Sequence, residues 1–266
     1  MQFLLAVACL VCLLTACGQE QGKSAHDDLI RLAAQGDAEV QLNLGLRYAD
    51  GRGVPQDDAE AVKWYRLAAE QGEARAQYLL GGMFASGEGV PQDDAEAVNW
   101  YRLAAEQRHA GAQLNLGLRY ADGRGVPQDD AEAVRWYRLA AEQGEARAQY
   151  LLGGMFASGE GVPQDDAEAV NWYRLAAEQR HAGAQLNLGL RYANGEGVPQ
   201  DYIQAHMWFN LAASRESGAK AKSRAEGRDK VAGKMTLQTI AEAQRLAREW
   251  EPKTWEELRE SGASPK

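Results

Sequence analysis

Paired aspartates recur in this sequence and are its first candidates for chemistry. Asp57-Asp58 is repeated once in each of a series of similar segments, and neighbouring carboxylates could hold a divalent cation or act in acid-base catalysis. Each pair precedes an alanine-rich stretch, where carboxylates accept hydrogen bonds from the free N–H groups of a helix N-terminus. Because Glu60 follows Asp57 by three residues, the pattern also predicts a capping box. We therefore interpret these aspartates as helix caps.

Histidine, glycine and serine do not occur in arrangements that favour an active site. His26, His109, His181 and His206 lack an H-x-x-x-H spacing and cysteine partners, and two of them begin repeating units as turn residues. The Gly51-Arg52-Gly53 turn lacks the preceding strand and following Lys-Ser/Thr of a phosphate-binding loop. Ser86 and Ser158 lie in turns without a nearby base. We predict no catalytic residue, metal, cofactor or small-molecule substrate.

The chain is acidic, and this excludes one class of partner. It has 266 residues, with 29 Lys and Arg against 38 Asp and Glu, and a net charge of −9. Beyond Ser214 there are 12 basic and 9 acidic residues, which leaves 17 against 29 before it. Nucleic-acid binding requires clustered Lys and Arg to contact phosphates. We therefore predict that the protein does not bind nucleic acid.

The stretch from Met1 to Cys17 holds all three cysteines and forms a candidate export signal. Phe3 to Leu14 is an apolar run too short to span a bilayer and of the length of a signal-peptide core. Leu14-Thr15-Ala16-Cys17 resembles the lipobox of bacterial lipoproteins, in which the cysteine is acylated and becomes the new N-terminus. The alternative is a plain secretory signal with a chance cysteine.

The lipoprotein resemblance implies a location and a layout for the N-terminus. Residues 1–16 would be the signal peptide, Cys17 the lipidated residue, and residues 17–26 a polar tether. Several acyl chains would hold the protein firmly to a membrane. Because Gly18 rather than Asp follows the cysteine, the resemblance favours the outer membrane of a bacterial envelope, with the protein on the periplasmic face.

Residues 37–216 consist of five units of equal length, here called repeats 1 to 5. Repeats 2 and 4 are identical, and repeats 1 and 3 differ at four positions, so the true period is two repeats. The repeats are residues 37–72, 73–108, 109–144, 145–180 and 181–216, and a partial unit over 27–36 precedes them.

Each repeat is predicted to form two helices, A and B. In repeat 1, helix A runs from about Ala38 to Ala49, and Gly51 and Pro55 end it. Its core face contains Gln41, Leu44, Gly45 and Tyr48. The apolar stripe of helix B contains Ala61, Trp64, Tyr65, Ala68 and Ala69. So short a pair cannot bury its own apolar face, and the pairs must therefore stack into a solenoid.

The residues of repeat 1 follow the pattern L-G-x-x-Y/F-x-x-G-x-G-V-P-Q-D-x-x-x-A-x-x-W-Y/F-x-x-A-A. They are Leu44-Gly45, Tyr48, Gly51, Gly53-Val54-Pro55-Gln56-Asp57, Ala61, Trp64-Tyr65 and Ala68-Ala69. This pattern resembles the Sel1-like repeat, a relative of the tetratricopeptide repeat. The resemblance implies an all-α fold, a right-handed α-solenoid of stacked antiparallel helix pairs.

The C-terminal segment, residues 217–266, departs from the repeat and is predicted to form a helical C-terminal cap. Gly218 to Val231 is expected to be one helix. Thr236 can cap a second helix that runs to about Trp250, with Pro252 beyond its end. We expect Lys253–Lys266 to be a loosely held tail.

The outward face of helix A is the predicted site for partners. In repeat 1, Asn43, Leu46 and Arg47 point away from the core face, and by resemblance to tetratricopeptide solenoids this side lines a concave groove. The equivalent groove residues are Leu79, Met83, Asn115, Leu118, Arg119, Leu151, Met155, Asn187, Leu190 and Arg191. Arg can pair with carboxylates, and Met adapts its shape to a ligand. Alternatively, Asn and Arg are merely solvated, and Leu79 and Met83 pack onto the next repeat.

The main functional hypothesis is a lipid-anchored, non-enzymatic scaffold that binds protein partners. A second hypothesis comes from Sel1-like proteins that are penicillin-binding or β-lactamase-like. Their repeats carry paired cysteines, whereas this chain has none after Cys17. Turnover of nitrocefin would distinguish this enzyme from a scaffold. A third hypothesis is a structural spacer without a partner.

Replacing the lipobox cysteine tests the anchor. We expect Cys17→Ala to leave the precursor uncleaved at this site and to prevent acylation, because the thiol that accepts the lipid is gone. Labelling of cells with radioactive palmitate measures the result. Continued incorporation of palmitate into the variant would show that the lipobox assignment is wrong.

Overall fold

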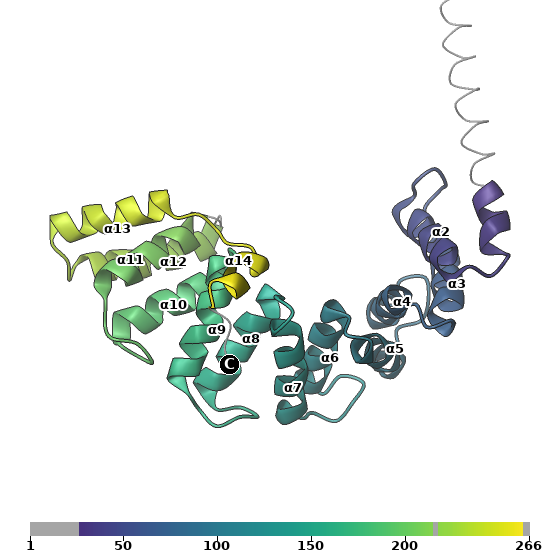
Figure 1. The fold of residues 1–266 in the computed structure, drawn as a ribbon, viewed down its shortest axis with the longest axis horizontal. Helices are drawn as coiled ribbons and strands as arrows, with labels where there is room; N and C mark the ends of the chain where they lie inside the picture. The colour runs from purple at the N-terminus through teal and green to yellow at the C-terminus, as the bar shows by residue number, and fades with distance from the viewer. Residues whose placement is uncertain (1–26, 215–217, 263–266) are drawn as a thin grey trace, which may run out of the picture. The chain divides into compact units, whose positions relative to one another are not determined.

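The computed structural model describes residues 27–214 and 218–262, and all regular structure in these ranges is helical (Figure 1). The predicted signal peptide over 1–16, Cys17 and the predicted tether over 17–26 lie outside the described residues, which begin with a short helix over 27–33. None of the described helices is both long enough and apolar enough to cross a membrane. The helices that follow are α2 (Ala38–Asp50), α3 (Asp58–Glu70), α4 (Ala74–Ser86), α5 (Asp94–Glu106), α6 (Ala110–Asp122), α7 (Asp130–Ala141), α8 (Ala146–Ser158), α9 (Asp166–Glu178), α10 (Ala182–Asn194), α11 (Tyr202–Ala213), α12 (Gly218–Ala232), α13 (Leu237–Glu249) and α14 (Trp255–Glu260).

The repeats form helix pairs as predicted, with α2 to α11 supplying helices A and B in turn. Helix A packs on helix B of its own repeat, as in α2 with α3 and α8 with α9, and helix B packs on the next helix A, as in α3 with α4. The chain divides into two compact units. We call them the N-terminal unit, whose described part is residues 27–112, and the C-terminal unit, which begins at Gln113.

Aspartate caps begin the B helices, as the sequence predicts. The Asp57 Oδ1 accepts a hydrogen bond from the Glu60 N–H at 3.0 Å, and Gly51 ends helix α2 with a left-handed φ of 66°. The second bond of the predicted capping box does not form. The Asp57 N–H donates instead to the Tyr48 carbonyl at 3.0 Å, and the Glu60 carboxylate pairs with Lys63. Equivalent side-chain caps are Asp93, Asp129, Asp165 and Asp201.

A glycine of helix A lies against an aromatic ring of helix B in every repeat. A Cβ added to Gly45 would come within 2.6 Å of the Tyr65 ring, and one added to Gly153 within 2.8 Å of the Tyr173 ring. The other pairs are Gly81 with Tyr101, Gly117 with Tyr137, and Gly189 with Phe209. The missing side chain therefore lets the two helices approach closely enough to bury the ring, and Tyr65 is 2% exposed.

Buried glutamines join one repeat to the next. The Gln77 Nε2 donates to the carbonyl of Ala69 in the preceding helix B at 3.1 Å, and its Oε1 accepts from Gln107 Nε2 at 2.8 Å. Gln149 makes the same two bonds, with Ala141 and Gln179. Each glutamine thus gives a carbonyl near a helix end a second hydrogen bond, beside the one that this carbonyl accepts from the N–H of the following glycine, Gly72 or Gly144. The sequence analysis placed Gln41 on the core face but did not predict these bonds.

The C-terminal region is helical, as expected, and packs onto the last repeat. Helices α12 and α13 both contact α11, and Thr236 caps α13 in a reciprocal capping box with Thr239 (Figure 1). The prediction of a loose tail after Lys253 is wrong for the described residues. Helix α14 lies there, and its Leu258 is only 2% exposed within the core of the C-terminal unit.

Two adjacent glycines of α8 allow a matched test of the helix–ring contact. Gly153→Ala would place a methyl group 2.8 Å from the Tyr173 ring, so we expect it to cost about 1–3 kcal/mol of the free energy of unfolding, as overpacking does. Gly154→Ala meets nothing nearer than the Tyr173 hydroxyl at 3.8 Å and should be neutral or gain up to about 1 kcal/mol in helix propensity. Urea unfolding of both variants gives the comparison. Equal stabilities would contradict the proposed role of Gly153.

Candidate partner-binding surface

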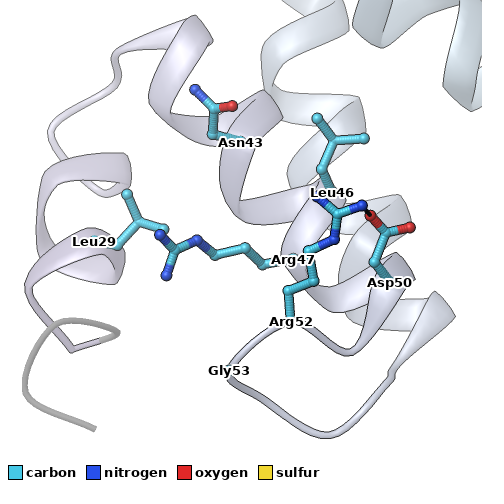
Figure 2. A pocket seen from close by; sticks show the side chains of 7 residues that line it. All are labelled: Leu29, Asn43, Leu46, Arg47, Asp50, Arg52 and Gly53. Atoms are coloured by element: carbon cyan, nitrogen blue, oxygen red, sulfur yellow. Dashed lines mark ion pairs between the residues drawn. The ribbon is translucent and has the colours of Figure 1, made fainter. Parts of the chain in front are cut away.

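The outward face of α2 forms one side of a recess in the N-terminal unit. Gln41, Leu44 and Gly45 are buried, as predicted for the core face, whereas Asn43 and Arg47 are exposed. The recess has a volume of about 610 Å³ (Figure 2). It is lined by Leu29, Asn43, Leu46, Arg47, Asp50, Arg52 and Gly53.

The chemistry of this recess combines positive charge with apolar surface. The Arg47 side chain extends toward Leu29 of the helix over residues 27–33, whereas Arg52 pairs with Asp50 at 3.0 Å (Figure 2). The recess therefore holds two guanidinium groups and one carboxylate, beside the apolar side chains of Leu29 and Leu46. Such a surface can bind a carboxylate through two parallel hydrogen bonds and pack an apolar side chain next to it.

The C-terminal unit has a recess at the equivalent positions of repeat 3. It has a volume of about 190 Å³ and contains the predicted residues Asn115, Leu118 and Arg119. The other lining residues are Asp122, Arg124 and Arg147, of which Arg147 comes from the next repeat. The lining thus contains three guanidinium groups and one carboxylate. The predicted site residues did not include the turn residues Arg52 and Arg124. Repeats 2 and 4 have glutamate at this turn position, and this alternation of charge could have indicated the two arginines.

The methionines predicted to line the groove in repeats 2 and 4 are buried instead. Met83 is 8% exposed and Met155 is 9% exposed, so neither presents a surface to a partner, and this part of the expectation is wrong. Leu79 and Leu151 are half-buried. At this helix position the arginines of repeats 1 and 3 must keep a charged end in water, whereas the uncharged methionine packs into the core.

Repeat 5 shares only part of the predicted surface. Leu190 is 43% exposed, but the Arg191 side chain is only 16% exposed and forms ion pairs with Asp166 at 2.7 Å and Glu196 at 2.9 Å. Glu196 occupies the turn position that holds arginine in repeats 1 and 3. Asn187 is half-buried and hydrogen-bonds the Tyr173 hydroxyl. Arg191 therefore links two repeats, rather than offering its charge to a partner.

The histidines at repeat boundaries act as helix caps. His109 Nδ1 accepts a hydrogen bond from the Ala112 N–H at 3.1 Å, and its ring stacks on Tyr78 with centroids 4.6 Å apart. His181 caps α10 in the same way. Burial lowers the pKa of the His109 imidazole, which keeps the accepting nitrogen free of a proton. Among the described residues, no group of three or more His, Cys, Asp or Glu side chains could hold a metal ion.

Comparison with known families explains the repeated geometry. Five consecutive stretches, residues 38–73, 74–109, 110–145, 146–181 and 182–217, match the Sel1 repeat and together cover more than half of the chain. The chain belongs to the Sel1 repeat family. Sel1 repeat proteins are generally scaffolds for protein interactions and are typically not enzymes. No match is found among curated proteins.

Two solved Sel1 repeat structures share the fold of this chain. A Sel1 repeat protein from Oxalobacter formigenes is 33% identical with a TM-score of 0.73, over 90% of this chain and 99% of that one. The protein c5321, a protective antigen of uropathogenic Escherichia coli, is 37% identical with a TM-score of 0.71. That match covers 83% of this chain and 50% of c5321, so this chain spans about half the length of that relative.

Acidification should weaken the histidine cap of α6. Because the pKa of His109 is lower in the folded state than its ordinary 6.5, its contribution is complete above about pH 6.5 and is lost as the pH falls below that value. The loss stays below about 1.4 kcal/mol per pH unit, since one imidazole takes up one proton. His109→Asp restores the residue type of repeat 1, where Asp37 caps α2.

We therefore expect a smaller difference in unfolding free energy between pH 7.5 and 5.5 for His109→Asp than for the unchanged protein. Urea unfolding at both pH values measures it. The buried His206, whose pKa is also lowered by burial, should retain its own share of the pH dependence in both proteins. An unchanged pH dependence in the variant would show that the His109 cap does not titrate.

Proposed function

We propose that this Sel1 repeat protein is a lipid-anchored scaffold on the periplasmic face of a bacterial outer membrane. It binds protein partners through the outward faces of its A helices. Cys17 carries the lipid, and residues 17–26 connect it to the repeats. The protein holds or brings together other envelope proteins and performs no reaction of its own.

One observation supports the proposed binding surface: a recess at the same repeat positions occurs in both units. The same three helix positions, filled by Asn43, Leu46 and Arg47, line a recess in repeat 1 and again in repeat 3. In both cases arginines outnumber aspartates, although the chain as a whole carries a net charge of −9. Local positive charge on an acidic protein favours an acidic partner segment with apolar side chains.

Site-specific photocrosslinking in intact cells tests this proposal. A photoreactive residue replaces Leu46 or Leu118 in the recesses, and a control probe replaces Leu237, which is 88% exposed in α13. We expect defined crosslinked proteins from the two recess probes and none of these from the control. Crosslinked products that are the same for all three probes would contradict binding in the recesses.

Charge reversal separates binding from folding. Arg47→Glu and Arg119→Glu together should reduce the crosslinked product by about tenfold or more, because each removes a charge-assisted contact worth about 1.5–3 kcal/mol. The single variant Arg47→Glu should keep a melting temperature near that of the unchanged protein, because the Arg47 side chain is exposed. Arg191→Glu is the matched control, and it should lower the melting temperature because it breaks pairs with Asp166 and Glu196. Full crosslinking by the double variant would rule out the two arginines as partner contacts.

A further inference from the structure

The C-terminal segment covers the outer face of helix B in repeat 4. The Lys253 N–H donates to the Glu178 carbonyl at 3.0 Å, and the Lys253 Nζ lies 3.6 Å from the Glu178 Oε1. The Trp250 Nε1 donates to the other Glu178 oxygen at 3.3 Å. Trp255 packs on the turn at Gly144 so closely that a Cβ there would overlap its ring. Glu178 is therefore the anchor of a segment that ends in the buried Leu258.

Repeat 2 has the same sequence as repeat 4 but lacks this covering in the described part of the chain. Leu175 of α9 is 2% exposed, in the same core cluster as Leu258, whereas the identical Leu103 of α5 is 44% exposed. Glu178 has a side chain that is 14% exposed, whereas Glu106 is exposed. Because repeats 2 and 4 have the same sequence, their different exposures come from the C-terminal segment that packs on repeat 4.

The turn that receives the indole ring is also open in the N-terminal unit. Gly72 corresponds to Gly144, and an added Cβ at Gly72 would meet nothing within 4 Å. The turns after repeats 2 and 4 carry Arg108 and Arg180 at this position, despite a positive φ of 66° and 73°. Among the turns that end repeats 1 to 4, those of repeats 1 and 3 therefore carry no side chain that would block a flat ring. Leu67, the counterpart of Leu103 in repeat 1, is 43% exposed.

We propose that the B-helix face of the N-terminal unit, made of Leu67, Gly72, Leu103 and Glu106, binds a short amphipathic segment of a protein partner. The segment resembles residues 250–258 of this chain. It places an indole on Gly72, an ammonium group on Glu106 and an aliphatic side chain on Leu103. This surface is separate from the arginine-lined recesses of the A helices and does not depend on the function proposed for them.

The number of available segments explains why the occupant is another protein and not a second copy. The described part of each chain has more than one such face, and the one C-terminal segment already covers repeat 4. If it moved to repeat 2 of another copy, it would expose Leu175 and Glu178, so the apolar area buried would not increase. The face of repeat 2 therefore remains open to a segment from a different protein, with the charge that complements Glu106.

A synthetic peptide of residues 249–262 is the probe for this surface. Labelled with a fluorophore, it is titrated into the full-length protein up to about 1 mM and followed by fluorescence anisotropy. That range is needed because the attached segment benefits from a local concentration in the millimolar range. We expect saturable binding of one peptide per protein. The absence of binding up to this concentration would overturn the proposal.

Variants of the protein decide where the peptide binds. Leu103→Asn should weaken binding tenfold or more, whereas Leu237→Asn, which replaces an exposed leucine of α13, should leave it unchanged. Both side chains lie at the surface, and equal melting temperatures will confirm folding. Unchanged binding to Leu103→Asn would mean that the peptide replaces the attached segment on repeat 4, and this would also overturn the proposal.

A charge pair gives a second, independent criterion. Glu106→Gln in the protein and Lys253→Gln in the peptide should each weaken binding, and the two changes together should cost less than the sum of the separate losses, since they share one interaction. Additive losses would contradict contact between these two groups. Because Glu106 is exposed, its replacement does not threaten the fold.

Discussion

The contact between a glycine of helix A and an aromatic ring of helix B is the constraint on which the rest of this structure depends. Gly45 against Tyr65 sets how closely the two helices of a repeat can approach. With that distance fixed, alanines such as Ala61 and Ala68 fill the remaining space, and both are fully buried. Each helix pair then has one face left to pack on the next repeat. The buried glutamines join neighbouring repeats by donating hydrogen bonds to carbonyls near the ends of the B helices.

The two-repeat period gives neighbouring repeats different surfaces on the same framework. In repeats 1 and 3 the outward positions of helix A hold arginine, and the nearby turn adds another, so each site gathers positive charge. In repeats 2 and 4 methionine takes the arginine position and joins the core. The arginine-lined surface available to a partner is therefore present in repeat 1 and again in repeat 3.

The C-terminal segment shows how this family framework can bind a peptide on its other side. Its contacts with Glu178 use a backbone N–H, an indole N–H and an ammonium group together, while Leu258 adds apolar burial. A short helix such as α14 is not stable alone in water. Helix α14 is therefore ordered because it packs on the surface of repeat 4. Repeat 2 has the same sequence, and in the described part of the chain its equivalent surface is exposed.

The sequence by itself determined the helix pairs, their aspartate and glycine ends, and the core face of helix A, because these depend on local spacing and on caps within a few residues. It also located the helix A residues that line both recesses. It did not determine that Arg191 is held by Asp166 and Glu196, or that the end of the chain forms α14. Above all, it could not distinguish Leu103 from Leu175. Their local sequences are identical, and only the tertiary structure, which brings a distant segment onto one of them, decides which is buried.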